Sequence, residues 1–252
     1  ETGFKRLWNR GFTGRYAMFR WPTFVGGLTY NDSDYRAWKS GQPLKQFVES
    51  LPGTKNIMAH SMGNIVASSA LKQGLFVSNY ALIHAAVPAA CYDSNTGLNQ
   101  WSYTTPDTEA DLGFRGYLEN VSGHLINFYL REDSALSLWA TSNQLFKPQR
   151  YNAFTTGYYY DPNEVAGKRI GISFLSQIGR FVNRPHEAMA YVAQSQTLAV
   201  GAEGGTRGII SVYINLESYN YSDNTEHSGP WNYSIQEIYE FYDDLMDMFD
   251  LQ

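Results

Sequence analysis

The feature that most constrains the fold is an almost continuously apolar run at residues 80–87, Tyr-Ala-Leu-Ile-His-Ala-Ala-Val. Such a run is typical of a strand buried on both faces, as in a parallel sheet. Helical spacing of apolar residues alternates with strand-like segments along the chain. The other expected strands are 15–21, 56–59, 125–130 and 208–216, and the expected helices are 40–51, 63–71 and 234–248. This alternation predicts an α/β fold, a mostly parallel sheet with helices on both faces.

The domain organisation is expected to be a single domain over residues 1–252, because the sequence has no repeat and no Pro/Ser-rich linker. Residues 134–207 do not continue the regular alternation, and we interpret them as an inserted cap region that covers the sheet. Further expected elements are a short helix near 107–119, a helix at 185–199, and loops at 23–33, 151–160 and 201–208.

Composition excludes several classes of function. A net charge of −5, with 17% charged residues and no basic run, argues against a nucleic-acid partner. The single cysteine, Cys91, rules out an intrachain disulfide and a zinc site built on several cysteines, and we expect a buried thiol. No apolar stretch reaches the ~18 residues of a transmembrane helix.

The origin of the chain is suggested by two features. It begins with Glu1 rather than Met, which indicates a processed or truncated product. Four Asn-x-Ser triplets weakly favour a secreted source, hence an extracellular or periplasmic location. These triplets begin at Asn31, Asn120, Asn220 and Asn232.

The strongest chemical signal is Ala-His-Ser-Met-Gly at residues 59–63, between a short apolar strand and a helix rich in small residues. A serine nucleophile needs such a sharp strand-to-helix turn, which exposes its hydroxyl. Small residues two positions either side of Ser61, here Ala59 and Gly63, keep the turn free of collisions. The helix start behind Ser61 favours developing negative charge, and the Met62 backbone N–H can donate to an oxyanion.

A serine hydroxyl also needs an adjacent base, for which histidine has a suitable pKa, and an acid that fixes the imidazole tautomer. Five histidines are present. His60 lies in the turn and is expected to point away from the hydroxyl, and His84 is interpreted as a core residue of a buried strand. His124 opens a strand, His186 begins a helix, and His227 lies in a loop before the last helix.

With these residues the chain resembles the α/β-hydrolase superfamily, in its lipase- and esterase-like branch. The resemblance covers residues 15–252 and implies the triad order Ser, Asp, His, with the acid after a later strand and the histidine after the last one. It therefore implies Ser61 as nucleophile, Asp133 as acid and His227 as general base. Glu132, Asp161 and Glu217 remain alternatives for the acid.

One part of the family pattern is missing. The second oxyanion donor follows an early strand, often in a His-Gly sequence, and no such sequence precedes residue 15. The chain is expected to begin inside the next helix, at residues 4–8, so the fold is expected to be N-terminally incomplete. An open sheet edge at residues 15–21 predicts an oligomer or a partner segment that supplies the absent strands.

The sequence thus predicts a serine hydrolase that cleaves carboxylic esters of a small molecule, lipid or polymer, without a cofactor or metal. It has no phosphate loop, dinucleotide-binding fingerprint or His-Glu-x-x-His zinc sequence. The alternative is a catalytically impaired binding module that retains the hydrolase scaffold, which the absent oxyanion loop favours.

Overall fold

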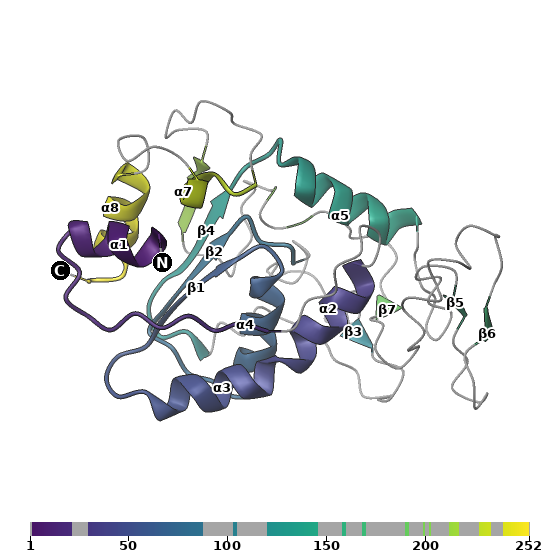
Figure 1. The fold of residues 1–252 in the computed structure, drawn as a ribbon, viewed down its shortest axis with the longest axis horizontal. Coiled ribbons are helices and arrows are strands. Elements are labelled where there is room, and N and C mark those ends of the chain that lie inside the picture. Colours follow the sequence, from purple (N-terminus) through teal and green to yellow (C-terminus); the bar gives the residue numbers. More distant parts are fainter. Residues whose placement is uncertain are drawn as a thin grey trace.

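The computed structural model contains a parallel β-sheet flanked by helices (Figure 1). It describes residues 2–21, 30–87, 103–104, 120–145, 158–159, 168–169, 190–191, 199, 202, 212–216, 227–232 and 239–251. Among these residues no helix combines the length and apolar character needed to cross a bilayer.

The sheet has four strands, all parallel, in the order β1-β2-β4-β8. The strands are β1 (Asn56–His60), β2 (Asn79–Ile83), β4 (Leu125–Tyr129) and β8 (Val212–Asn215). Every residue of β2 and β4 is buried, whereas the edge strand β1 is only partly buried. The predicted parallel sheet of an α/β fold is therefore confirmed.

The register brings the carboxyl ends of the strands into line. His60 of β1 pairs with Ile83 of β2, Ile83 pairs with Phe128 of β4, and Phe128 pairs with Ile214 of β8. Residues that directly follow each strand therefore meet at one edge of the sheet, where ligand sites of open α/β sheets lie.

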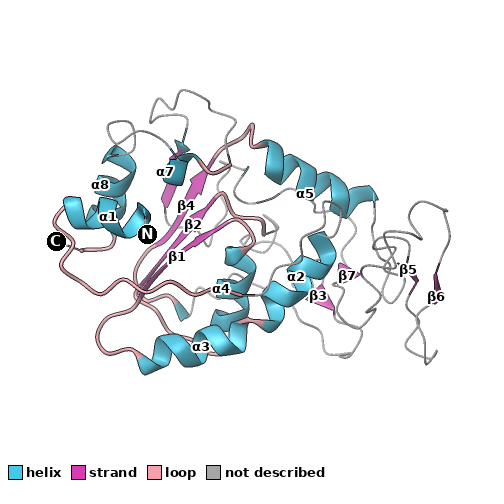
Figure 2. Cartoon of the chain, viewed as in Figure 1, coloured by secondary structure: helices cyan, strands magenta, loops and turns pink. Residues whose placement is uncertain are grey.

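Helices cover both faces of the sheet. Because side chains alternate along each strand, neighbouring residues of β2 pack against different helices. Tyr80 and Leu82 of β2 pack with one group of helices, and Ala81 and Ile83 pack with the other. The first group is α2 (Tyr30–Lys39), α3 (Gly41–Ser50) and α4 (Gly63–Lys72), and the second is α1 (Thr2–Asn9) and α8 (Tyr239–Met248). Figure 2 shows the two groups on opposite sides of the strands.

A third small core lies beyond the carboxyl edge. Helix α5 (Ser134–Leu145), which was not predicted from the sequence, places Leu136 and Trp139 against Ala86. The remaining described elements are the helix α7 (Gly229–Asn232) and the strands β3 (Tyr103–Thr104), β5 (Tyr158–Tyr159), β6 (Lys168–Arg169) and β7 (Ala190–Tyr191).

The predicted strand at residues 15–21 is wrong. These residues form no strand, and the described sheet begins at β1. Their aromatic side chains instead pack around the sheet edge: Tyr16 joins the core under α1 and α8, whereas Phe19 and Trp21 join the core under α2 to α4. The segment thus crosses from one face to the other, as the coil after α1 does in Figure 1. Its aromatic composition serves this packing rather than a backbone ladder.

Several other expectations need adjustment or lie outside the described residues. The strand predicted over 80–87 ends at Ile83, and α2 already begins at Tyr30, within the expected loop 23–33. Ala190 and Tyr191 pair with Thr104 and Tyr103 in an antiparallel ladder, which contradicts a helix there. The remaining expected elements are only partly covered. Tyr158 and Tyr159 form a strand, whereas Cys91, residues 107–119, most of the inserted region and the start of the helix expected at 234–248 lie outside the described residues. The predicted oligomer or partner segment stays a prediction.

Gly41 provides a test of the packing between α3 and α4. A Cβ atom at this position would lie 2.3 Å from Ser69 Oγ and 2.8 Å from the Ala70 nitrogen. Glycine-to-alanine changes in helices usually stabilise, but here we expect Gly41→Ala to lower the free energy of unfolding by roughly 1–3 kcal/mol through overpacking. Urea denaturation measures the change.

The matched control is Gln42→Ala, one residue further along the same helix at an exposed position. Its effect should stay within about 0.5 kcal/mol. A stabilised Gly41→Ala protein would show that the two helices are not in this close contact.

Candidate active site

Ser61 occupies a strained turn directly after β1. Its φ is +52°, a left-handed conformation that costs a non-glycine residue about 1–3 kcal/mol. The Ser61 N–H donates to the Ile83 carbonyl at 3.0 Å, and its carbonyl accepts from the Ala86 N–H at 3.2 Å. The turn is therefore held by the strand next to it, with α4 starting two residues later.

A buried asparagine closes this turn from inside. Asn64 Nδ2 donates to the carbonyls of Ala59 at 3.0 Å and Ser61 at 2.9 Å, on either side of the turn. The Tyr80 hydroxyl in turn donates to Asn64 Oδ1 at 2.8 Å, which fixes the orientation of the amide. Asn64 has no exposed surface, so these hydrogen bonds do not compete with water.

The space beside Ser61 is limited at Gly63, one of its two small neighbours. A Cβ atom on Gly63 would lie 3.3 Å from the Trp21 ring and 3.9 Å from the Ala59 side chain. A side chain at position 63 would therefore crowd the Trp21 ring, and a long one would also meet Ala59 of β1. Met62 is the N-cap residue of α4, without a side-chain cap, and its N–H has no carbonyl partner among the described residues.

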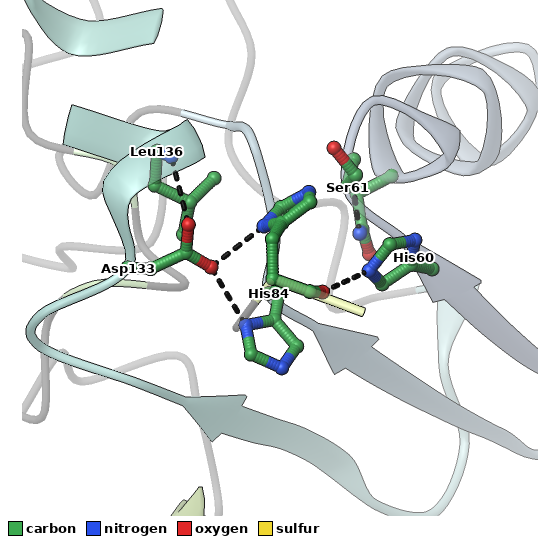
Figure 3. A network of polar contacts seen from close by, with 7 residues as sticks. His60, Ser61, His84, Asp133 and Leu136 are labelled. Carbon is green, nitrogen blue, oxygen red and sulfur yellow. Dashed lines mark hydrogen bonds and ion pairs between the residues drawn. The ribbon is translucent and has the colours of Figure 1, made fainter. Parts of the chain in front are cut away.

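Asp133 follows β4 and caps the N-terminus of α5. Its Oδ1 accepts from the Leu136 N–H at 2.9 Å. Its Oδ2 accepts from two imidazoles, His227 Nδ1 at 2.6 Å and His84 Nδ1 at 2.7 Å, as Figure 3 shows for the labelled Asp133 and His84. Burial raises the pKa of Asp133, but the hydrogen bonds from His227 and His84 outweigh it and hold the pKa well below its usual range.

His227 lies just before α7 and keeps 19% of its side chain exposed. An ionised carboxylate carries no proton, so His227 Nδ1 must donate to Asp133, and in the neutral ring Nε2 is then unprotonated. That tautomer is the one a general base needs. The hydrogen bond that we expected between Asp133 and His227 is present.

His60 anchors the backbone of this histidine. Its Nε2 lies 2.7 Å from the His227 carbonyl, which can only accept, so His60 Nε2–H donates. Burial, reinforced by the nearby His227, lowers the pKa of His60 from 6.5 to about 3. A neutral His60 therefore ties the loop of His227 to the end of β1.

The predicted hydrogen bond between Ser61 and His227 is absent from the structure. Ser61 and His227 are both described, and no hydrogen bond joins the Ser61 hydroxyl to the His227 ring. Catalytic hydrogen bonds are often long in proteins without substrate. In Figure 3 the Ser61 side chain points away from His60, as we expected of the two neighbours in the turn.

The other acidic residues and histidines considered for the site are either exposed or outside the described residues. Glu132 is exposed, and the carboxylate bound to His227 is that of Asp133. His124 is exposed before β4, at the opposite end of that strand. Asp161, Glu217 and His186 lie outside the described residues.

Two residues of the site, His84 and Asn64, were not predicted from the sequence. The signal for His84 was its position: it follows β2 as Asp133 follows β4, and adjacent parallel strands end together.

A metal ion is the other use to which these residues could be put. His84, Asp133 and His227 offer ligand atoms within 4.8 Å of one another. However, the separations of 2.6 and 2.7 Å between each Nδ1 and Asp133 Oδ2 are hydrogen-bond distances. A metal would need those nitrogens unprotonated and turned toward a common point, so the arrangement fits proton sharing better.

A groove among the described residues lies on the side of β1 away from β2. Its volume is about 1420 Å³, and it runs between residues 12–21 and the outer edge of β1. Neither Ser61 nor Asp133 nor His227 lines it. Ala59, His60 and Gly63, which flank Ser61, do line it, so the groove reaches the back of the turn that holds Ser61.

Comparison with known proteins gives no relationship: no protein-family model, curated protein or solved structure matches this chain.

Asn64 can be tested with an isosteric change. Asn64→Asp replaces the donor Nδ2 with an oxygen that faces the carbonyls of Ala59 and Ser61. We expect it to lower the free energy of unfolding by about 2–4 kcal/mol, because buried acceptors lose their donors. Tyr80→Phe, which removes only the hydroxyl on Asn64 Oδ1, should cost about 1 kcal/mol. A denaturation curve of Asn64→Asp that overlaps the wild-type curve would contradict this account.

The lowered pKa of His60 should make the free energy of unfolding depend on pH. Its pKa is lowered in the folded protein, so below about pH 6.5 the unfolded chain binds a proton that the folded protein does not. The free energy of unfolding should therefore fall as pH falls from 6.5 toward 3, by up to about 1.4 kcal/mol per pH unit for this residue. His60→Gln keeps a donor near the Nε2 position but does not titrate.

The measurement is urea denaturation at several pH values above the carboxylate range, in the wild type and in His60→Gln. The slope of unfolding free energy against pH should be shallower in the variant by about one proton. Equal slopes would mean that His60 is not held neutral in the folded protein.

Proposed function

We propose that this protein is a serine hydrolase of the α/β-hydrolase kind, with Ser61 as nucleophile, His227 as general base and Asp133 as acid. The observation that carries the proposal is geometric. Ser61 takes a left-handed backbone between β1 and α4, at the sheet edge where Asp133 and His227 share a hydrogen bond. A strained strand–serine–helix turn is the setting in which this class places its nucleophile.

In this proposal each side chain has one task. His227 Nε2 takes the proton of the Ser61 hydroxyl as its oxygen attacks the acyl carbon. Asp133, ionised and buried, stabilises the imidazolium that forms. The Met62 N–H at the start of α4 donates to the oxyanion, and His227 returns the proton to the departing alcohol. Water then releases the acid from the acyl-enzyme by the same steps, and no cofactor takes part.

The proposed substrates are carboxylic esters of a small molecule, a lipid or a polymer. Met62 packs against two cores, that of α4 and that of Leu136 and Trp139 beyond the sheet edge. Apolar surroundings of this kind suit an apolar acyl group and exclude water from the attacked bond. The Asn-x-Ser triplets and this substrate class agree with an extracellular or periplasmic enzyme.

A second candidate function is supported by one observation. Since no hydrogen bond joins the Ser61 hydroxyl to His227, the serine could be unactivated, and the fold would then serve as a binding module. Reaction with a fluorophosphonate distinguishes the two, because only a serine with a working base is labelled.

Ser61→Ala should abolish both fluorophosphonate labelling and ester hydrolysis, with a fall of at least 10³-fold or so, because the variant lacks the attacking oxygen. The matched control is Ser68→Ala, which alters a buried serine of α4 whose hydroxyl has no hydrogen-bond partner among the described residues. Labelling is followed by intact mass and hydrolysis with a chromogenic acyl ester. Activity retained by Ser61→Ala, or an unlabelled wild type, would rule out the proposed nucleophile.

A further inference from the structure

His84 is the buried group that the proposed mechanism leaves unused. It directly follows β2, has no exposed surface, and takes a left-handed backbone with φ +44°. Its N–H donates to the Phe128 carbonyl at 3.1 Å, which fixes the residue to the end of β4. The second strained residue of the sheet edge is thus a histidine next to the candidate acid.

Both imidazoles bind the same oxygen of the acid. His84 Nδ1 lies 2.7 Å and His227 Nδ1 lies 2.6 Å from Asp133 Oδ2, while Oδ1 accepts from the Leu136 N–H. The carboxylate is therefore held by three donors (Figure 3). With Oδ1 bound to α5 and Oδ2 bound to His84, the carboxylate can neither rotate nor withdraw from His227.

The protons can be assigned from the acceptors. Because Asp133 is ionised, both Nδ1 atoms must carry protons, and a neutral His84 then leaves its Nε2 unprotonated. That Nε2 is buried and has no hydrogen-bond partner within the described part of the chain. Burial lowers the pKa of His84, which keeps the ring neutral. His84 therefore donates the same single hydrogen bond over the pH range in which His227 would work.

We propose that His84 is a positioning residue of this site, which orients the Asp133 carboxylate toward His227 and takes up part of its negative charge. This inference rests on the proposed function, since its consequence is a change in the proton affinity of His227 as general base. A carboxylate that also accepts a hydrogen bond from His84 stabilises the His227 imidazolium less.

Three titratable groups face His227 among the described residues: Asp133, His84 and His60. The His60 ring lies 4.7 Å from the His227 ring, and the His84 ring lies 5.3 Å from it. His60 and His84 are both neutral, so only Asp133 carries charge. A change at His84 therefore reaches His227 through the shared oxygen, whereas a proton on either neighbour would act by repulsion.

Two substitutions distinguish the hydrogen bond that His84 donates from the volume that its ring fills. His84→Asn keeps an N–H near the Nδ1 position, whereas His84→Phe fills the volume without a donor. The readout is the rate constant of fluorophosphonate labelling of Ser61, measured from about pH 5 to pH 9. In His84→Phe the acidic limb should move to higher pH by about 0.5–1 unit, with a plateau roughly tenfold lower, and in His84→Asn the limb should stay near its wild-type position.

The possible outcomes decide between the roles. An unshifted limb in His84→Phe, or equal losses in both variants, would assign His84 a merely structural role and overturn the inference. Loss of wild-type labelling on chelation would overturn it in favour of a metal site. A wild type that is never labelled contradicts the proposed function itself, which is a distinct result.

If His84→Phe does not fold, proton NMR of the wild type provides the test. Imidazole N–H protons bonded to a carboxylate resonate far downfield, so two such signals are expected, and His84→Asn should retain one. Both should persist across the pH range in which His84 stays neutral. A single signal in the wild type would overturn the shared carboxylate.

Discussion

The parallel register of the four strands is the constraint on which the rest of the site depends. Pairing of His60 with Ile83, Ile83 with Phe128 and Phe128 with Ile214 makes the strands end in line. Ser61, His84 and Asp133 follow three of these strands, so His84 and Asp133 meet within hydrogen-bond distance and Ser61 lies at the same edge of the sheet. A register shift by one residue would also exchange the two faces of each strand, which the two buried cores forbid. The packing of the core therefore fixes the geometry of the site.

Backbone strain accumulates at the same edge and is offset locally. Ser61 and His84 both have positive φ, and each costs about 1–3 kcal/mol. At Ser61 the offset comes from Asn64, whose amide bridges the carbonyls of Ala59 and Ser61. At His84 it comes from the ladder bond to Phe128 and from the charge-assisted bond to Asp133. The groups that stabilise the strained backbone at these two positions thus also position the residues of the candidate site.

The sequence allowed prediction of those parts that follow from local patterns. The buried strand near residue 80, the strand–serine–helix turn and Asp133 after a strand all depend on runs of apolar residues and on small neighbours. The strand predicted at residues 15–21 was wrong, because aromatic side chains suit a strand and equally suit packing around an exposed sheet edge. His84 was assigned to the core because burial is visible in a sequence pattern, whereas a shared carboxylate is not. Asn64 was overlooked for the same reason: its partners are backbone carbonyls, which no sequence pattern reveals.

The electrostatics of the site follow from having one charge among four titratable groups. Three imidazoles surround a single carboxylate, and a proton on any of them would be attracted by Asp133 but repelled by a second imidazolium. His60 and His84 are the more deeply buried rings, and burial disfavours their charged forms. His227 alone combines the hydrogen bond to Asp133 with partial exposure to solvent. The geometry therefore singles out His227, rather than His60 or His84, for the general-base role that we propose.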